Sequence, residues 1–268
     1  MKAILRILGA VVFFVGSWLL LAQVNWVEHF GVKEITESSE EKLSEFIKEH
    51  IERSEEVIRD KEVLNTIDSI LNTITKDNFI NKDDIKVIVV NNEVVNAYAL
   101  PSEYMVLNSG LIKACNSAEA LAGVMAHELG HIQMQHVKKK LLKEVGVAVL
   151  VSSTSGGGGE VIQQITKTLS STAYDRSLEE EADEKAVTYM INAEIDPEPL
   201  AEFFYELSMK EPEFMSKLDW VSTHKNSEER AEEIVTRLKS ESYDVRPVLQ
   251  PGSWKALQEK LKELGEDD

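Results

Sequence analysis

The sequence predicts a mainly helical α+β fold with a small β-sheet near the start of its body. Two observations carry this prediction. Apolar residues recur at helical spacing over most of the chain from residue 37 onward. Residues 85–107 instead hold short β-branched and apolar runs separated by turn residues, which is typical of strands. The 268 residues suffice for one domain with an ordinary core and some appendages.

The composition is that of a globular protein with an acidic surface. The net charge is -18 and the sequence pI is about 4.8. A charge of this sign disfavours binding to nucleic acid through the bulk surface, so no nucleic-acid partner is expected. Cys115 is the one cysteine of the chain, which excludes an intramolecular disulfide and a cysteine-based zinc site.

The chain begins with a short basic segment followed by an apolar one. Lys2 and Arg6 precede residues 7–24, which are nearly all apolar or small. This pattern is typical of a signal peptide or a membrane anchor, and the run is close to the lower length limit for spanning a bilayer. The lack of an A-x-A cleavage site favours the uncleaved anchor. We therefore expect residues 1–24 to contact or cross a membrane, with the rest of the protein exported to the extracytoplasmic side, which is the periplasm in a Gram-negative cell.

Three regions follow this segment. Residues 25–80 are expected to be a helical region, residues 81–245 the domain that carries the motifs described below, and residues 246–268 a C-terminal helix. Ser117 is expected to cap the long helix of the domain. The glycine-rich stretch 152–159 is expected to be a connecting loop, with a mobile flap as the alternative. Strands are predicted at 85–90, 94–100 and 104–107, and helices at 37–76 (one or two), 117–145, 160–172, 177–194, 197–210, 227–240 and 253–265.

The long helix contains the motif His127-Glu128-Leu129-Gly130-His131. Two histidines at i and i+4 project from the same face of a helix, so that both imidazoles can bind one tetrahedral zinc ion. Glu128 lies about 100° round the helix and can reach a zinc-bound water without ligating the metal. Zinc lowers the pKa of such a water to about 7, so that a carboxylate can remove its proton. The alternative is that two histidines share a helix face in the core by accident.

A zinc hydrolase needs a third protein ligand and an open fourth position. The candidates are His136, His224 and an acidic residue of the cluster 179–183. His136 lies about 140° from the second histidine of the motif on the same helix, so it is expected beside the ligands or at the surface unless the helix stops. Glu179 and Asp183 share a helix face, so one could ligate zinc while the other accepts a hydrogen bond from a ligand histidine. The two glutamates that follow Glu179 are expected to face solvent.

Three segments, 97–136, 174–186 and 222–230, resemble the HtpX and CAAX-prenyl-protease-like family of gluzincin zinc metallopeptidases. The chain is most similar to the small exported members, of the BepA and LoiP type. The resemblance covers about residues 85–240. It implies a zincin-type metallopeptidase domain with the small sheet beside the H-E-x-x-H helix, one zinc ion per chain, and protein or peptide substrates.

The resemblance also implies roles for single residues. Glu179 becomes the third zinc ligand, and Asp183 supports the ligands. The family usually has the motif S-R-x-x-E ending at the ligand glutamate, and Arg176 is the arginine of that motif here. The family's later T-H-P motif reads Thr223-His224-Lys225 here, so its proline is lost.

The last part of the resemblance concerns the substrate. Arg230 stands where the family has an arginine six residues after the histidine of that later motif. His224, supported by Arg230, is expected to stabilise the oxyanion or to occupy the open zinc position in a resting state. Asn96-Ala97 resembles the start of the edge strand that binds an extended substrate by strand addition.

Together these features predict a zinc-dependent metalloendopeptidase that hydrolyses misfolded or envelope proteins. Glu128 is expected to deprotonate the zinc-bound water and to pass the proton to the leaving amine. One alternative is a zinc-containing chaperone or assembly factor with little proteolytic turnover. Another is a purely structural metal site, which the presence of Glu128 disfavours.

Overall fold

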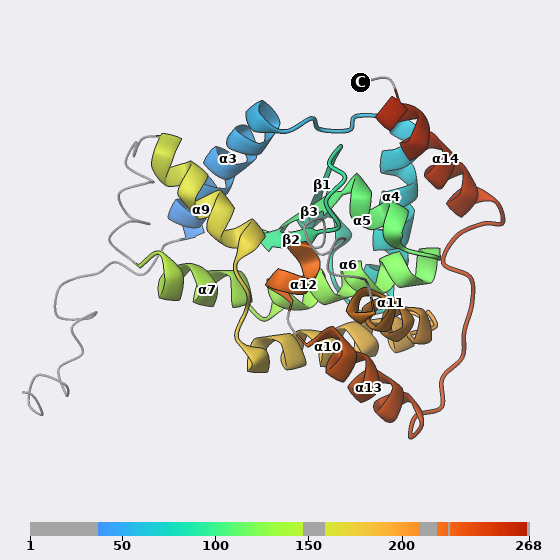
Figure 1. Ribbon diagram of the computed structural model, residues 1–268. Helices are drawn as coiled ribbons and strands as arrows, with labels where there is room; N and C mark the ends of the chain where they lie inside the picture. Colours follow the sequence, from blue (N-terminus) through green and yellow to red (C-terminus); the bar gives the residue numbers. More distant parts are fainter. Residues whose placement is uncertain (1–36, 147–158, 210–218, 225, 267–268) are drawn as a thin grey trace, which may run out of the picture. The chain divides into compact units, whose positions relative to one another are not determined.

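The computed structural model describes residues 37–146, 159–209, 219–224 and 226–266 (Figure 1). The expected anchor or signal segment lies outside these ranges, as does all but the last residue of the glycine-rich stretch. Within the described ranges, no helix combines the length and the apolar character needed to cross a bilayer.

Three short strands form one mixed sheet (Figure 1). β3 (Tyr104–Asn108) lies in the middle, with β1 (Lys86–Val90) parallel on one side and β2 (Ala97–Leu100) antiparallel on the other. The chain reverses between β2 and β3 through a turn in which Ser102 and Glu103 both have positive φ. All four residues of the edge strand β2 are buried. The three strands predicted from the sequence are confirmed.

The helix α6 (Ala118–Gln133) runs between the sheet and α10 (Arg176–Asn192) in Figure 1. Nearly every residue of α6 is buried, as its run of small and apolar residues requires. Ser117 caps this helix as predicted, because its hydroxyl oxygen accepts a hydrogen bond from the N–H of Ala120 at 3.1 Å. The side chains of α6 therefore pack against neighbouring helices and the sheet on several sides.

The other described helices surround α6 and the sheet. They are α3 (Glu37–Ser54), α4 (Lys61–Lys76), the 3-10 helix η1 (Lys82–Asp84), α5 (Ser109–Ala114), α7 (His136–Glu144), α9 (Gly159–Ser171), α11 (Glu198–Ser208), α12 (Asp219–Thr223), α13 (Ser227–Leu238) and α14 (Ser253–Glu266). α4 and α11 pack on α6, and α13 packs on α10 and α11. The helices predicted from α9 onward agree with these bounds to within two residues. The very short α5 and α12 were not predicted, because so few residues show no helical period.

The prediction of a single helix over residues 117–145 is wrong. α6 ends at Gln133 and α7 begins at His136, because Gln135 adopts the left-handed conformation with a φ of 55°. An α-helix cannot continue through such a residue. Neither glycine nor proline stands at the break, so the usual local signals do not mark it.

The close approach of α6 and α11 depends on Gly123. A Cβ atom at Gly123 would lie 2.7 Å from the Cβ of Leu200. We expect Gly123→Ala to lower the free energy of unfolding by about 1–3 kcal/mol, because two packed helices must move apart. Urea denaturation measures this. Gly159→Ala, where nothing lies within 4 Å of the added carbon, is the control and should not destabilise. Equal stability of the two variants would contradict this account of the packing.

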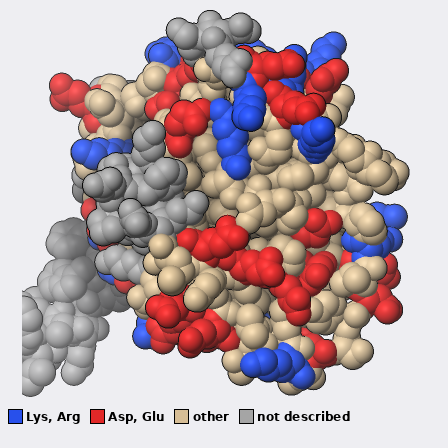
Figure 2. Space-filling model, turned by 45° about the vertical axis from the view of Figure 1, so that its right-hand side comes forward, with Lys and Arg blue, Asp and Glu red and all other residues tan. Residues whose placement is uncertain are grey.

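The surface reflects the acidic composition. Figure 2 shows Asp and Glu side chains gathered across the lower half of one face. The chain carries 47 Asp and Glu residues against 29 Lys and Arg residues. A surface of this sign repels the phosphate backbone of nucleic acids.

Candidate metal centre

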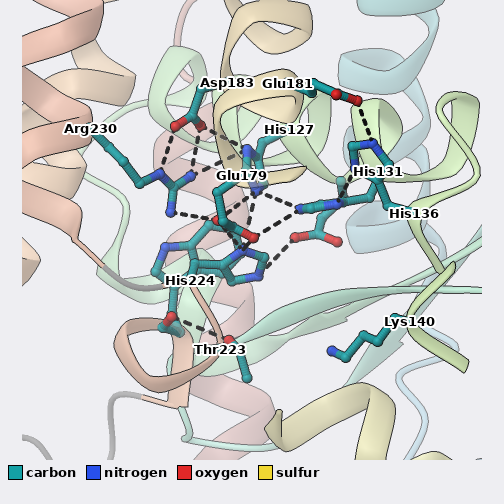
Figure 3. A network of polar contacts seen from close by, with 12 residues as sticks. His127, His131, His136, Lys140, Glu179, Glu181, Asp183, Thr223, His224 and Arg230 are labelled. Carbon is teal, nitrogen blue, oxygen red and sulfur yellow. Dashed lines mark hydrogen bonds and ion pairs between the residues drawn. The ribbon is translucent and has the colours of Figure 1, made fainter. Parts of the chain in front are cut away.

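Two histidines of α6 lie side by side in the interior (Figure 3). His127 and His131 are completely buried, and their Nε2 atoms are 3.0 Å apart. Their i, i+4 spacing on one helix face produces this proximity. Gly130 lets α10 approach closely, since a Cβ there would lie 3.1 Å from the backbone oxygen of Ala182. α10 can therefore place its own side chains against the histidine pair.

Glu179 from α10 and His224, directly after α12, complete the cluster. Glu179 Oε1 lies 3.4 Å from His131 Nε2, and Glu179 Oε2 lies 3.7 Å from His127 Nε2. His224 Nδ1 lies 2.9 Å from Glu179 Oε2 and 3.2 Å from His127 Nε2. The four side chains are buried, and each offers one donor atom within 4.8 Å of the other three. Sequence elements separated by almost a hundred residues thus meet at one point.

Asp183, one turn beyond Glu179, orients His127. Its Oδ1 lies 2.9 Å from His127 Nδ1. Arg230 of α13 donates hydrogen bonds to the same carboxylate from Nε at 2.6 Å and from Nη2 at 2.7 Å. Because His127 Nδ1–H donates to this carboxylate, His127 Nε2 presents a lone pair to the cluster. The 3.3 Å contact between Arg230 Nη2 and His127 Nδ1 is then not a hydrogen bond, since both nitrogens carry protons.

The protonation states of the cluster suit a metal ion. Burial lowers the pKa of His131 well below its usual value and that of His224 to about 4, so both imidazoles are neutral. Burial by itself would raise the pKa of Glu179. His224 and Arg230, whose Nη1 lies 3.0 Å from Glu179 Oε2, instead hold it well below its usual value. Neutral imidazoles and an ionised carboxylate are the donor set that zinc takes.

Glu128 lies beside these ligands with its carboxylate buried. Neither carboxylate oxygen accepts a hydrogen bond of normal geometry from any described residue. Burial raises the pKa of Glu128 to about 7. The nearby backbone N–H of Ala99 in β2 acts in the opposite direction, although its geometry is not that of a normal hydrogen bond. His224 Nε2 lies 3.4 Å from Glu128 Oε1. A buried carboxylate without hydrogen bonds destabilises the fold, which indicates that it is kept for chemistry.

The residues present fit one zinc ion. Two imidazoles and one carboxylate, from His127, His131 and Glu179, are a ligand set of catalytic zinc sites, and His224 supplies a further imidazole. A cation at this point would stabilise both the lone pair at His127 Nε2 and the carboxylate of Glu128.

His136 contacts the cluster from the side away from Glu179 (Figure 3). It is completely buried; its Nδ1 lies 3.0 Å from His131 Nδ1, and its Nε2 lies 3.1 Å from Glu181 Oε2. The helix break makes this contact possible, because an unbroken helix would carry His136 round to another face. Glu181 was expected to face solvent only and instead binds this histidine.

Three more predicted residues lie around the cluster. Arg176 is largely exposed and pairs with two glutamates at the surface. Asn96 is buried, and its side-chain amide donates a hydrogen bond to the backbone oxygen of Ser170 at 2.9 Å. Ala97 begins β2 and is buried as well. Supporting or substrate-binding roles for these three residues remain predictions.

Two aromatic rings and a lysine, which no sequence motif indicated, also enclose the cluster. Tyr174 stacks on the ring of His131 with centroids 3.9 Å apart, and Trp220 stacks on that of His224 at 4.0 Å. Lys140 is buried, with its Nζ 4.1 Å from the centre of the Tyr174 ring and hydrogen-bonded to two backbone oxygens. Trp220 stands four residues before His224, a spacing that could have indicated their contact.

Comparison with known proteins agrees with the metal centre. The sequence profile described as peptidase family M48 matches residues 62–238, which include all four cluster residues. Metalloprotease LoiP of Escherichia coli (strain K12) is 30% identical over 154 residues, which are 55% of this chain and 60% of that protein. Mitochondrial metalloendopeptidase OMA1 of Arabidopsis thaliana is 27% identical over 150 residues, which are 54% of this chain and 30% of that protein. For the beta-barrel assembly-enhancing protease of E. coli (strain K12), the identity is 27% over 134 residues, or 44% of this chain and 27% of that protein. The match thus spans between about a quarter and three fifths of the length of these relatives.

Proposed function

This chain belongs to peptidase family M48, and from that membership we propose that it is a zinc-dependent metalloendopeptidase. The observation that carries the proposal is the convergence of His127, His131 and Glu179 beside the buried carboxylate of Glu128. A structural zinc site is closed by its ligands and has no use for an adjacent base. A base next to three protein ligands is instead the arrangement of metal-assisted hydrolysis.

His127, His131 and Glu179 would hold the zinc ion, which when bound polarises the scissile carbonyl and makes water more acidic. Asp183 keeps His127 in the tautomer whose Nε2 is free. Glu128 takes the proton of the attacking water on its carboxylate and delivers it to the nitrogen of the leaving amine. The burial of Glu128 keeps bulk water away from that proton.

His224 and Arg230 are proposed to stabilise the negative charge that develops on the carbonyl oxygen. In this structure His224 Nδ1 touches both Glu179 and His127, so its imidazole stands where a substrate oxygen would need to lie. The ligands and Glu128 are all buried. We therefore assign this arrangement to a closed resting state, which opens when α12 and His224 move.

The substrates are proposed to be proteins, including misfolded or envelope proteins, bound in extended form along β2 from Asn96-Ala97. The backbone N–H of Ala99 lies beside Glu128. This position supports binding along β2, because one side of the strand then faces the proposed base. The similarity to a relative named beta-barrel assembly-enhancing protease in E. coli supports protein substrates.

The cellular location is proposed from the sequence alone. Residues 7–24 are nearly all apolar or small and follow Lys2 and Arg6, which supports a membrane anchor or an export signal. The metal centre is then proposed to lie on the extracytoplasmic side.

Removal of the metal tests the proposed function. Dialysis against a chelator is expected to abolish casein hydrolysis, and stoichiometric zinc should restore it, because the zinc ion would supply the charge that polarises the carbonyl and acidifies the water. Zinc at 100 times its Kd should also raise the free energy of unfolding by about 2.7 kcal/mol. A zinc-containing chaperone would instead suppress the aggregation of unfolded casein without cleaving it. Hydrolysis that persists at full rate in zinc-free protein would refute the proposal.

A further inference from the structure

Three carboxylates of α10 reach three different histidines (Figure 3). Glu179 contacts His224, Asp183 contacts His127, and Glu181 contacts His136. The first two lie on the face of α10 that meets the cluster. Glu181 lies beyond them, where its side chain is 46% exposed. In the described part of the chain it reaches the cluster through its contact with His136.

The contact between His131 and His136 requires a definite arrangement of protons. Their Nδ1 atoms are 3.0 Å apart on the side of His131 away from Glu179, where a hydrogen bond with one nitrogen donating and the other accepting accounts for the contact. The Nε2 atoms of His127 and His131 are equally close, but these two atoms face the proposed metal position, where an ion would take both lone pairs. The carboxylate of Glu181 accepts from His136 Nε2, which therefore carries the proton of the neutral imidazole. His136 Nδ1 is then the acceptor, and His131 Nδ1 the donor.

This arrangement determines which nitrogen of His131 is free. With its proton on Nδ1, His131 presents a lone pair at Nε2, the atom that faces His127 and Glu179. Only this tautomer can ligate a metal there. Asp183 has the same effect on His127 by direct contact. His131 obtains it through an intervening imidazole.

We propose that His136 and Glu181 are positioning residues that hold His131 in its metal-ligating tautomer. The inference rests on the proposed zinc site. The break at Gln135 is the structural feature that makes it possible, because it starts a new helix at His136 and brings that side chain to the far nitrogen of His131.

Glu181→Ala tests the proposal, because Glu181 is half-exposed and its loss leaves no buried cavity. The variant should bind zinc about 10–100-fold more weakly than the natural protein, as expected when a ligand histidine loses the partner that orients it. The dissociation constant is measured by competition with a chromogenic chelator. Thermal unfolding of the zinc-free proteins should be unchanged, which separates this effect from misfolding.

Two matched variants sharpen the test. Glu180→Ala removes the same charge from the neighbouring position, where the carboxylate pairs with Arg176 at the surface, and should bind zinc like the natural protein. Glu181→Gln keeps an acceptor oxygen for His136 Nε2–H and should recover most of the affinity. A purely electrostatic effect of Glu181 would not be rescued in this way.

The outcomes separate this inference from the function on which it rests. Natural protein that binds no zinc refutes the proposed function. Natural protein that binds zinc, with equal affinity in Glu181→Ala and Glu180→Ala, overturns only the tautomer proposal. Equal losses in Glu181→Ala and Glu181→Gln overturn it as well.

Discussion

Glu128→Gln is expected to reduce peptide hydrolysis by about 10²–10⁴-fold while the protein keeps its zinc. The amide has almost the shape of the carboxylate but cannot take a proton from water at neutral pH. Glu128 is not one of the four side chains whose donor atoms converge, so the ligand set stays intact. Casein hydrolysis and zinc content, measured on the same sample, test both parts of the prediction.

Glu119→Gln is the matched control for this variant. Glu119 lies in the first turn of the same helix, and its carboxylate accepts a hydrogen bond from the N–H of Val248. It lies eight positions before His127, or about 12 Å along the helix axis. The control should hydrolyse casein at the natural rate. Undiminished hydrolysis by zinc-loaded Glu128→Gln would remove Glu128 from its proposed role.

Arg230→Met should lower the free energy of unfolding of the zinc-free protein by about 3–5 kcal/mol. The Arg230 side chain is buried, with its Cζ 4.1 Å from the centre of the Phe204 ring, so methionine retains much of the packing. It does not replace the positive charge between Asp183 and Glu179. Burial would otherwise raise the pKa of Asp183, which Arg230 holds at about 2. Loss of this cation removes the one guanidinium that contacts both buried carboxylates.

Urea denaturation of the zinc-free protein measures this change without a contribution from metal binding. Arg176→Met is the control, because the Arg176 side chain is 59% exposed and pairs with glutamates at the surface. An exposed pair of this kind contributes about 0–1 kcal/mol. Equal destabilisation by the two variants would contradict the proposal that Arg230 stabilises the fold by compensating buried carboxylates.

Part of the metal centre follows directly from local spacing. His127 and His131 had to share a face, because i and i+4 lie one turn apart in any α-helix. The same rule paired Glu179 with Asp183 on α10, and the structure places both against the histidines. Spacing alone left open which carboxylate would ligate. The resemblance to known metallopeptidases selected Glu179, and its carboxylate is the one that reaches both Nε2 atoms.

The surroundings of His131 could not be derived in this way. A continuous helix would have turned His136 away, and no glycine or proline signals that Gln135 leaves the helical conformation. Glu181 looked like one more solvated glutamate in an acidic run. Its contact with His136 requires the start of α7 to lie against α10 after the break. No local sequence pattern in either helix predicts that packing.

The sequence by itself determined the mainly helical α+β class, the central helix with its paired histidines and base, and the acidic surface. These properties depend on periodicity and composition, which act over one or two helical turns. The resemblance implied that Glu179, His224 and Arg230 act at those histidines, but no local pattern determined their meeting, which the tertiary structure shows. Only the tertiary structure decided that His136 and Glu181 lie behind His131. Such contacts join residues far apart in the chain, and they depend on how whole helices pack, including the close approach that Gly130 allows between α6 and α10.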